Sequence, residues 1–171
     1  AEGGVIGMDL VLSDISHAYG HRGAGIPVLN GIDLEMDRGQ LCLLTGPSGG
    51  GKTTLLTIIC GMMKPTSGRI EVFGRNLNAL RAGERLQFRR RELGVVFQQH
   101  HLVSGLSVVD NVALPLVIGG GNWGRAREKA LSMLSSFGLE QLAQRFPENL
   151  SGGQQQRAAI ARALVHDPQL I

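Results

Sequence analysis

Aromatic residues are scarce in this chain of 171 residues: they make up 4% of it and include one tyrosine and one tryptophan. Stacking on a planar ligand must therefore come from very few side chains. The formal net charge of +3 permits an acidic partner but is too small to indicate DNA or RNA. With 43% hydrophobic and 18% charged residues, the composition is typical of a globular domain rather than a disordered chain.

Cysteines and long apolar runs are also rare. Cys42 and Cys60 are the only cysteines, and because each lies in an apolar run we expect both to be small buried residues. Their spacing fits neither a metal site nor a disulfide framework, so a reducing cytosolic compartment fits best. The best candidate for a membrane span, residues 108–118, is short of the ~18 apolar residues required and is interrupted by polar residues and a proline.

Short apolar runs alternate with helical patterns, which predicts an α/β domain with a largely parallel sheet. Alternating apolar residues predict half-buried strands at 10–12 and 32–36. The run 40–45 is apolar on both faces, as expected of a central parallel strand. Residues 70–73 and 94–97 are further strand candidates.

The later part of the chain is predicted to be mainly helical. Residues 123–137 carry apolar side chains on one face of an amphipathic helix, and Gly138 is a candidate C-cap. No signal peptide is visible, and a native start at Met8 would leave a short leader. The chain is therefore divided into a leader or tag remnant, an α/β core that binds nucleotide, a helical subdomain, and a signature segment that returns to the core: 1–7, 8–98, 99–150 and 151–171.

A glycine-rich segment follows the predicted strand at 40–45 and opens an apolar helix at Thr54. It fills every fixed position of the pattern GxxxxGK[ST], with Gly46, Pro47, Ser48, Gly49, Gly50, Gly51, Lys52 and Thr53. Successive backbone N–H groups at such a helix start converge on phosphate oxygens. Lys52 adds a cation for the β- and γ-phosphates, and the Thr53 hydroxyl can bind Mg²⁺. The alternative is a glycine-rich turn without a ligand, and the pattern favours a nucleoside triphosphate.

A second candidate anion site precedes the apolar helix pattern of 155–165. It consists of Ser151, Gly152, Gly153 and Gln154. A hydroxyl, bare backbone N–H groups and the positive end of a helix all favour phosphate. Alone, this sequence would more often be an ordinary helix cap, but together with the phosphate loop it predicts a second phosphate contact.

The stretch LSGGQQQRAAIARALVHDP at 150–168 resembles the signature of the ABC (ATP-binding cassette) ATPase family, and the resemblance extends over nearly the whole chain from Met8. It implies a P-loop NTPase fold with a mainly parallel core sheet, an N-terminal antiparallel β part and an inserted helical subdomain. It also implies that two subunits sandwich two ATP molecules head to tail. Ser151 and Gly153 would then bind the γ-phosphate held by the other subunit.

Two further residues match positions of this family. Gln98 resembles the glutamine that contacts Mg²⁺ and water and senses the transport partner, although by itself it could be an ordinary polar residue at the end of a strand. Tyr19 resembles the aromatic residue that stacks on adenine, although a core or surface tyrosine is the alternative. The resemblance thus implies catalytic roles for Lys52 and Gln98, and metal binding by Thr53 and Gln98.

The segments 96–102 and 110–116 are similar to the lipoprotein-release and macrolide-export branch of the family. That resemblance implies an integral membrane permease as partner, contacted by the segment around Gln98 and the helical subdomain. A second ATPase subunit would be the other partner. The expected location is peripheral, on the cytoplasmic face of the inner membrane.

Two other functions remain open from the sequence. One is a non-transport ABC ATPase of translation or DNA repair, although the roughly fifty residues between Gln98 and Ser151 exclude the subtype with a long coiled-coil insertion. The basic stretch 81–91 lacks interleaved aromatics and is expected to be a solvated helix face, so no nucleic acid is expected as partner. The other is a regulatory module that binds nucleotide without turnover.

The last residues, 169–171, stand where the family resemblance implies a strand leading to the Walker B aspartate and catalytic glutamate. We therefore expect the parent protein to hydrolyse ATP, and the 171-residue chain alone to bind it without appreciable turnover. A missing core strand would leave a sheet edge without partners, so weak stability and poor dimerisation are also expected.

Overall fold

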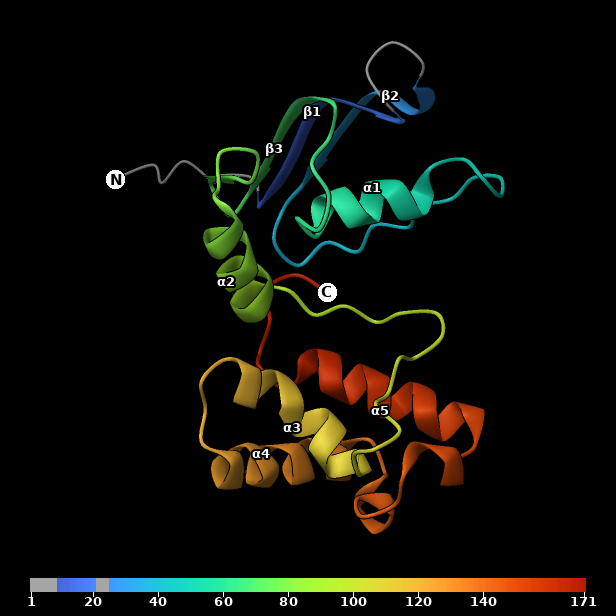
Figure 1. The fold of residues 1–171 in the computed structure, drawn as a ribbon, viewed down its shortest axis with the longest axis vertical. Coiled ribbons are helices and arrows are strands. Elements are labelled where there is room, and N and C mark those ends of the chain that lie inside the picture. Colours follow the sequence, from blue (N-terminus) through green and yellow to red (C-terminus); the bar gives the residue numbers. More distant parts are fainter. Residues whose placement is uncertain (1–8, 21–24) are drawn as a thin grey trace. The chain divides into compact units, whose positions relative to one another are not determined.

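The computed structural model describes residues 9–20 and 25–171 of the chain, which divides into two compact units, 1–85 and 86–171 (Figure 1). The predicted leader at 1–7 and the start at Met8 lie outside the described residues. Both units contain regular structure, with strands in the first and helices in both, so the predicted α/β class is confirmed. The predicted boundaries after residues 98 and 150 stay predictions.

The first unit contains a four-stranded antiparallel sheet with strand order β2-β1-β3-β4. Its strands are β1 (Leu10–Tyr19), β2 (Ile26–Met36), β3 (Ser67–Val72) and β4 (Arg75–Asn76). The strands predicted at 10–12 and 32–36 fall within this sheet, and the one predicted at 70–73 is confirmed over 70–72, because Phe73 lies in the following turn. It is the antiparallel β part that the family resemblance implies.

A bulge in β1 decides which side chains form the core of this sheet. Leu12 and Ile15 are both buried although they are three positions apart, and the pairing register shifts between them. Asp14 accommodates the shift with a φ of +50°. A Cβ on Gly68, across from the bulge, would lie 2.3 Å from the Asp14 carbonyl oxygen, so only glycine fits there.

The strands predicted at 40–45 and 94–97 are absent from the structure. Residues 40–46 make no sheet pairing, and the side chains of Leu41 and Leu43 are 98% and 83% exposed. Cys42 is exposed too, so its predicted burial is wrong, and Cys60 is half-buried. Of the mainly parallel core sheet, the described residues contain only an isolated parallel bridge between Leu93 and Leu170. An apolar run becomes a strand only when a neighbouring strand accepts its hydrogen bonds.

Two helices complete the first unit and its connection to the second. Helix α1 (Lys52–Ile59) buries Leu55, Ile58 and Ile59. Helix α2 (Ala82–Glu92) crosses the division between the units and buries Phe88. Its basic stretch is less solvated than predicted. Arg81 and Arg91 are exposed, whereas the other three arginines are half-buried: Arg85, Arg89 and Arg90.

The second unit is built from three α-helices that share one apolar core (Figure 1). They are α3 (Val108–Ile118), α4 (Trp123–Ser136) and α5 (Gly152–Leu164), with the short 3₁₀ helices η1 (Glu140–Leu142) and η2 (Pro147–Asn149) between the last two. The helix predicted at 123–137 is confirmed over 123–136. Ala126, Ala130 and Leu134 are buried at intervals of four, whereas Leu131 lies off that stripe and is exposed.

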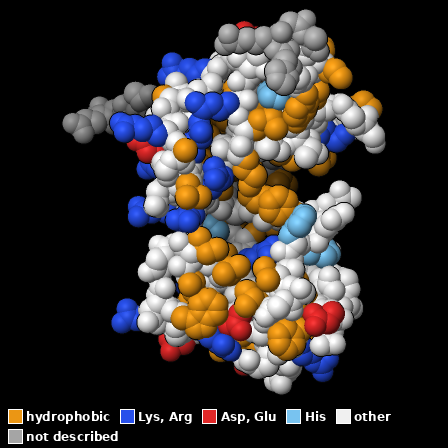
Figure 2. Space-filling model, in the orientation of Figure 1, with side chains coloured by type: hydrophobic (Ala, Val, Ile, Leu, Met, Phe, Trp, Pro, Cys, Tyr) orange, Lys and Arg blue, Asp and Glu red, His pale blue; other side chains and the backbone are white. Residues whose placement is uncertain are grey.

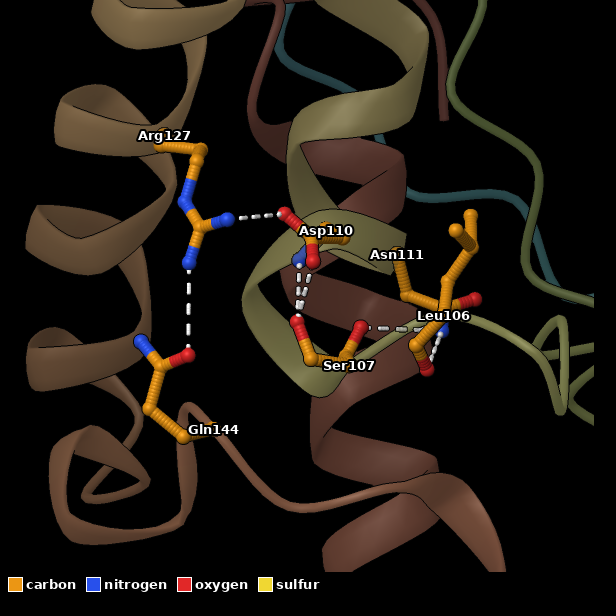
Figure 3. Close-up of polar contacts among 6 residues, drawn as sticks. All are labelled: Leu106, Ser107, Asp110, Asn111, Arg127 and Gln144. Atoms are coloured by element: carbon orange, nitrogen blue, oxygen red, sulfur yellow. Dashed lines mark hydrogen bonds and ion pairs between the residues drawn. The ribbon is translucent and has the colours of Figure 1, made fainter.

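A polar network fixes the start of α3 and joins it to α4 (Figure 3). The Ser107 hydroxyl donates to Asp110 Oδ2 at 2.5 Å and accepts from the Asp110 amide at 3.3 Å. Arg127 of α4 pairs with Asp110 Oδ1 at 3.0 Å and donates to Gln144 at 3.3 Å. The pattern Ser-x-x-Asp before an apolar run signals this cap in the sequence.

Within the part of the chain that the structure describes, no helix has the length and apolar character needed to span a bilayer. Apolar side chains nevertheless reach the surface of both units (Figure 2). In the second unit, large exposed apolar side chains occur in the segment around Gln98 and in the helical region: Val96, Phe97, Val103, Ile118, Trp123, Leu131 and Phe146.

Candidate phosphate-binding site

The predicted phosphate loop lies in the first unit, between β2 and α1, and residues 46–50 are all exposed. Gly46, Gly49 and Gly51 have φ angles of +152°, +81° and +80°, a region that residues with a Cβ rarely adopt. Nothing lies within 4 Å of a Cβ placed on Gly46 or Gly49. These two glycines are therefore needed for the curl of the backbone, and the loop has open space beside it.

Gly51 is the N-cap of α1 and forms no side-chain cap. A Cβ at this position would lie 2.7 Å from Leu29 Cδ2 and 2.8 Å from the Val28 carbonyl oxygen, both in β2. The first turn of α1 contains no acidic residue. The positive end of this helix therefore has no carboxylate of its own turn to offset it, which favours an anion from outside the chain.

Lys52 holds its ammonium group inside the loop. The Nζ atom donates to the carbonyl oxygens of Gly46 at 2.8 Å and Pro47 at 2.7 Å. The Gly50 amide closes a turn onto the same Pro47 carbonyl at 3.1 Å. Because an ammonium group has three protons, these two contacts leave one for a phosphate oxygen. Ser48 and Thr53 are exposed, so the two hydroxyl groups of the motif are accessible to a ligand.

Tyr19, at the end of β1, lies against the first turn of α1. Its hydroxyl is 3.2 Å from Thr54 Oγ1, and Thr54 is buried. The His17 ring contacts the Tyr19 ring edge to face, with centroids 4.8 Å apart. The Tyr19 side chain is still 45% exposed, so part of its ring is available to a planar ligand.

The second predicted anion site forms the start of α5. Ser151 is the N-cap, its Oγ accepts from the Gln154 amide at 3.3 Å, and Gln154 Oε1 accepts from the Ser151 amide at 2.8 Å. This reciprocal pair is a capping box. Gly152 and Gly153 are exposed, and a Cβ on either would meet nothing within 4 Å. The backbone here is open to solvent, and the Ser151 hydroxyl proton remains available to donate.

The structure thus brings together Tyr19 and residues 46–54 in the first unit. Gln98 and the signature residues 151–154 belong to the second unit. Gln98 is exposed and lies outside regular structure, two residues before His100.

Sequence reasoning did not single out two residues that organise the surroundings of Gln98. Arg162 of α5 donates to the carbonyl oxygens of His100 and His101, each at 2.6 Å, and burial lowers the pKa of its guanidinium. Asn111 is fully buried and bonds both the amide and the carbonyl of Val103, at 2.7 and 3.0 Å. No sequence signal marks the Arg162 contacts, because they join residues 61 and 62 positions apart.

Comparison with known proteins gives consistent matches over most of the chain. It is 44% identical over 162 residues to the lipoprotein-releasing system ATP-binding protein LolD of Hyphomonas neptunium, covering 95% of this chain and 71% of that protein. It is 42% identical over 147 residues to the cell division ATP-binding protein FtsE of Escherichia coli, covering 86% of this chain and 66% of that protein. The chain thus spans about two thirds of the length of these relatives.

A solved structure shares the fold. The dimeric structure of a post-hydrolysis state of the ATP-binding cassette MJ0796, bound to ADP and Pi, matches with a TM-score of 0.84 and 37% sequence identity, covering 93% of this chain and 70% of that one. The sequence model of the family described as ABC transporter matches residues 29–171. The chain therefore belongs to the ABC transporter family, in the group of its ATP-binding subunits.

Proposed function

We propose that the chain binds ATP as the nucleotide-binding part of an ABC transporter, and that the parent protein couples ATP binding and hydrolysis to movement of a substrate by a membrane partner. The observation that carries this proposal is the start of α1. Its N-cap is a left-handed glycine without a side-chain cap, and the Lys52 ammonium lies within the glycine loop before it. A triphosphate supplies the negative charge that this arrangement lacks.

Each part of the first site has a distinct task. Backbone N–H groups within 46–54, where Pro47 has none, donate to the phosphate oxygens, and Lys52 donates its remaining proton to the β- and γ-phosphates. The exposed ring of Tyr19 stacks on the adenine. Its hydroxyl contact with Thr54 keeps the ring next to the helix start.

The donor set also fits Mg²⁺, which prefers oxygen ligands and retains several waters. Thr53 offers an exposed hydroxyl directly after Lys52, and Gln98 offers an exposed side-chain carbonyl. When bound, the ion neutralises charge on the phosphates. We assign Thr53 and Gln98 as the residues of this chain that hold it, directly or through water.

The signature residues would act on a second copy of the chain. Ser151, Gly152 and Gly153 are exposed and Gln154 is half-buried, and together they form a helix start with an available hydroxyl donor and no acidic residue in its first turn. The related MJ0796 cassette is described as dimeric, which supports a head-to-tail pair with two ATP molecules at its interface.

A membrane permease is the second proposed partner, with the chain peripheral on the cytoplasmic face of the inner membrane. The exposed apolar side chains around Gln98, among them Val96 and Phe97, supply a surface for such a contact. Similarity to LolD favours lipoprotein release as the process. Similarity to FtsE favours cell division as a second candidate, and co-purification of the whole protein with its membrane partner distinguishes the two. Neither relative favours a role in translation, DNA repair or regulation without turnover.

A polypeptide of residues 1–171 is expected to bind Mg-ATP, and binding without appreciable turnover is the expectation that the family resemblance gives for it. Phosphate release is the measurement for this expectation. Turnover that survives repurification and disappears with Lys52→Ala would contradict it.

Nuclear magnetic resonance tests the proposed site directly. Titration with Mg-ATP should shift the amide signals of 46–54 strongly. A matched titration of the Lys52→Ala variant should leave them nearly unchanged at the same concentration. If ATP leaves the 46–54 signals of the unsubstituted chain undisturbed, the proposed function is wrong.

A further inference from the structure

The segment that carries Gln98, residues 93–101, is fastened at its beginning to the chain that follows α5. We call it the Gln98 strap. The Gly94 amide donates to the Leu170 carbonyl at 2.8 Å, and Leu93 pairs with Leu170 as a parallel bridge. The Nε2 atom of His166 lies 2.8 Å from the Leu93 carbonyl oxygen. The beginning of the strap therefore has two hydrogen-bonded attachments, the bridge to Leu170 and the contact with His166.

Close packing reinforces the same attachment. A Cβ on Gly94 would lie 2.4 Å from the Ala163 carbonyl oxygen and 2.9 Å from the Pro168 ring. Such a distance to a backbone atom leaves no room for a side chain. Gly94 is thus held closely against the end of α5 and the residues that follow it.

The other end of the strap is held by one side chain of the same helix. Arg162 donates through one terminal nitrogen to the His101 carbonyl and through the other to the His100 carbonyl, both at 2.6 Å. A planar guanidinium can span two successive carbonyl groups in this way, whereas a lysine ammonium acts as a single point of attachment.

The backbone at this end needs support. His100 and His101 have φ angles of +58° and +47°, a left-handed conformation that residues with a Cβ adopt at a cost in free energy. Arg162 is half-buried, and burial lowers the pKa of its guanidinium. The two carbonyls compensate for part of the hydration that the guanidinium loses, so the side chain and the left-handed backbone stabilise each other.

We propose that Arg162 is a positioning residue for Gln98: its bonds to His100 and His101 hold the Gln98 strap in the conformation that keeps the Gln98 side chain exposed for the role that the proposed function assigns to it. This proposal rests on the proposed function, which assigns Gln98 to the Mg²⁺ and nucleotide site. The helix that carries Arg162 begins at the signature residue Ser151. A movement of α5 on binding a second copy would therefore reach Gln98 through this arginine.

The first test measures hydrogen exchange of the nucleotide-free chain. In Arg162→Gln, the amides of 99–103 should exchange at least about tenfold faster, as expected for loss of a charged hydrogen bond. The amides of 155–161 in α5 should keep their protection, which shows that the helix remains folded. In Arg162→Lys, the exchange of 99–103 should be faster than in the unsubstituted chain and slower than in Arg162→Gln, because lysine retains one attachment. Arg157→Gln, which alters an exposed arginine of the same helix, is the matched control and should change neither region.

The second test asks whether the effect passes through Gln98. The ratio of ATP affinities measured with Mg²⁺ and with a chelator should fall in Gln98→Ala by roughly threefold to tenfold. Arg162→Gln should lower the same ratio by a similar factor. The double variant should show no further loss, because the arginine acts through the glutamine.

The outcomes separate this proposal from the proposed function. Unchanged exchange of 99–103 in Arg162→Gln would overturn the positioning role whatever the nucleotide results are. Faster exchange with an unchanged Mg²⁺ effect would also overturn it, since Arg162 would then only stabilise the fold. Failure of the unsubstituted chain to bind ATP would overturn the proposed function and the role of Gln98 with it.

Discussion

The two helix starts assigned to phosphate, those of α1 and α5, are built in opposite ways. The N-cap of helix α1 is Gly51, which has a φ of +80° and forms no side-chain cap. Helix α5 begins at Ser151, whose side chain and backbone form a closed capping box with Gln154. The start of α5 is therefore stabilised by its own residues, whereas the start of α1 packs against β2 without a side-chain cap, which leaves it open to an anion. This difference agrees with the proposed function, in which the α1 start binds the phosphates and the α5 start contacts nucleotide on a second copy.

The largest expected effect on stability comes from a substitution at the N-cap of α1. Gly51→Ala should lower the free energy of unfolding by about 3 kcal/mol, because it combines a left-handed φ with contacts of 2.7 and 2.8 Å to Leu29 and Val28. Gly74→Ala is the matched control, since Gly74 has a φ of +71° with nothing within 4 Å of an added Cβ. It should cost only about 1 kcal/mol. Urea denaturation followed by circular dichroism measures both, and equal losses would show that packing against β2 contributes nothing.

Lys52→Ala comes next and removes the cation from the α1 start. ATP affinity should fall about thirtyfold, which corresponds to about 2 kcal/mol for a charged hydrogen bond to phosphate. Titration calorimetry measures the change. Lys64→Ala, an exposed lysine of the same unit, is the control and should alter the affinity less than twofold. Similar losses in both variants would mean that net charge, rather than the loop geometry, attracts the nucleotide.

The comparison of the two helix starts also shows how far sequence reasoning reaches. The pattern GxxxxGK[ST] located the glycine-rich loop before α1, and the structure shows why glycine is required at 46, 49 and 51. Alternating apolar residues located two strands of the antiparallel sheet, at 10–12 and 32–36. In these cases the local sequence carries the physical constraint, through φ angles or through the period of a strand.

Sequence reasoning failed where structure depends on distant partners. The run 40–45 is apolar on both faces, but Leu41 and Leu43 are exposed because no neighbouring strand pairs with them among the described residues. The support of the Gln98 strap by Arg162 was equally invisible. Apolar character can be read from a sequence, whereas the partner that gives it a role is set by the tertiary fold.

Ser151→Ala tests the self-sufficiency of the α5 start. Loss of the cap should lower the free energy of unfolding by about 1 kcal/mol, a typical value for an N-cap serine. Gln156→Ala, at an exposed position of the same helix, is the control and should change stability by less than about 0.5 kcal/mol. ATP affinity of the monomeric chain should remain the same in both, because the predicted role of Ser151 concerns nucleotide on another copy. A weaker ATP affinity of monomeric Ser151→Ala would contradict the prediction that Ser151 contacts only nucleotide on another copy.

The smallest expected effect concerns the side chain that steadies the open start of α1. Tyr19→Phe keeps the ring but removes the hydroxyl that lies 3.2 Å from Thr54 Oγ1. The free energy of unfolding should fall by about 0.5 to 1 kcal/mol, while ATP affinity stays within about twofold, because stacking needs only the ring. Tyr19→Ala separates the two contributions and should weaken ATP binding by roughly fivefold to tenfold. If Tyr19→Phe weakened binding as much as Tyr19→Ala, the hydroxyl bridge to α1 rather than the ring face would be the feature that the nucleotide requires.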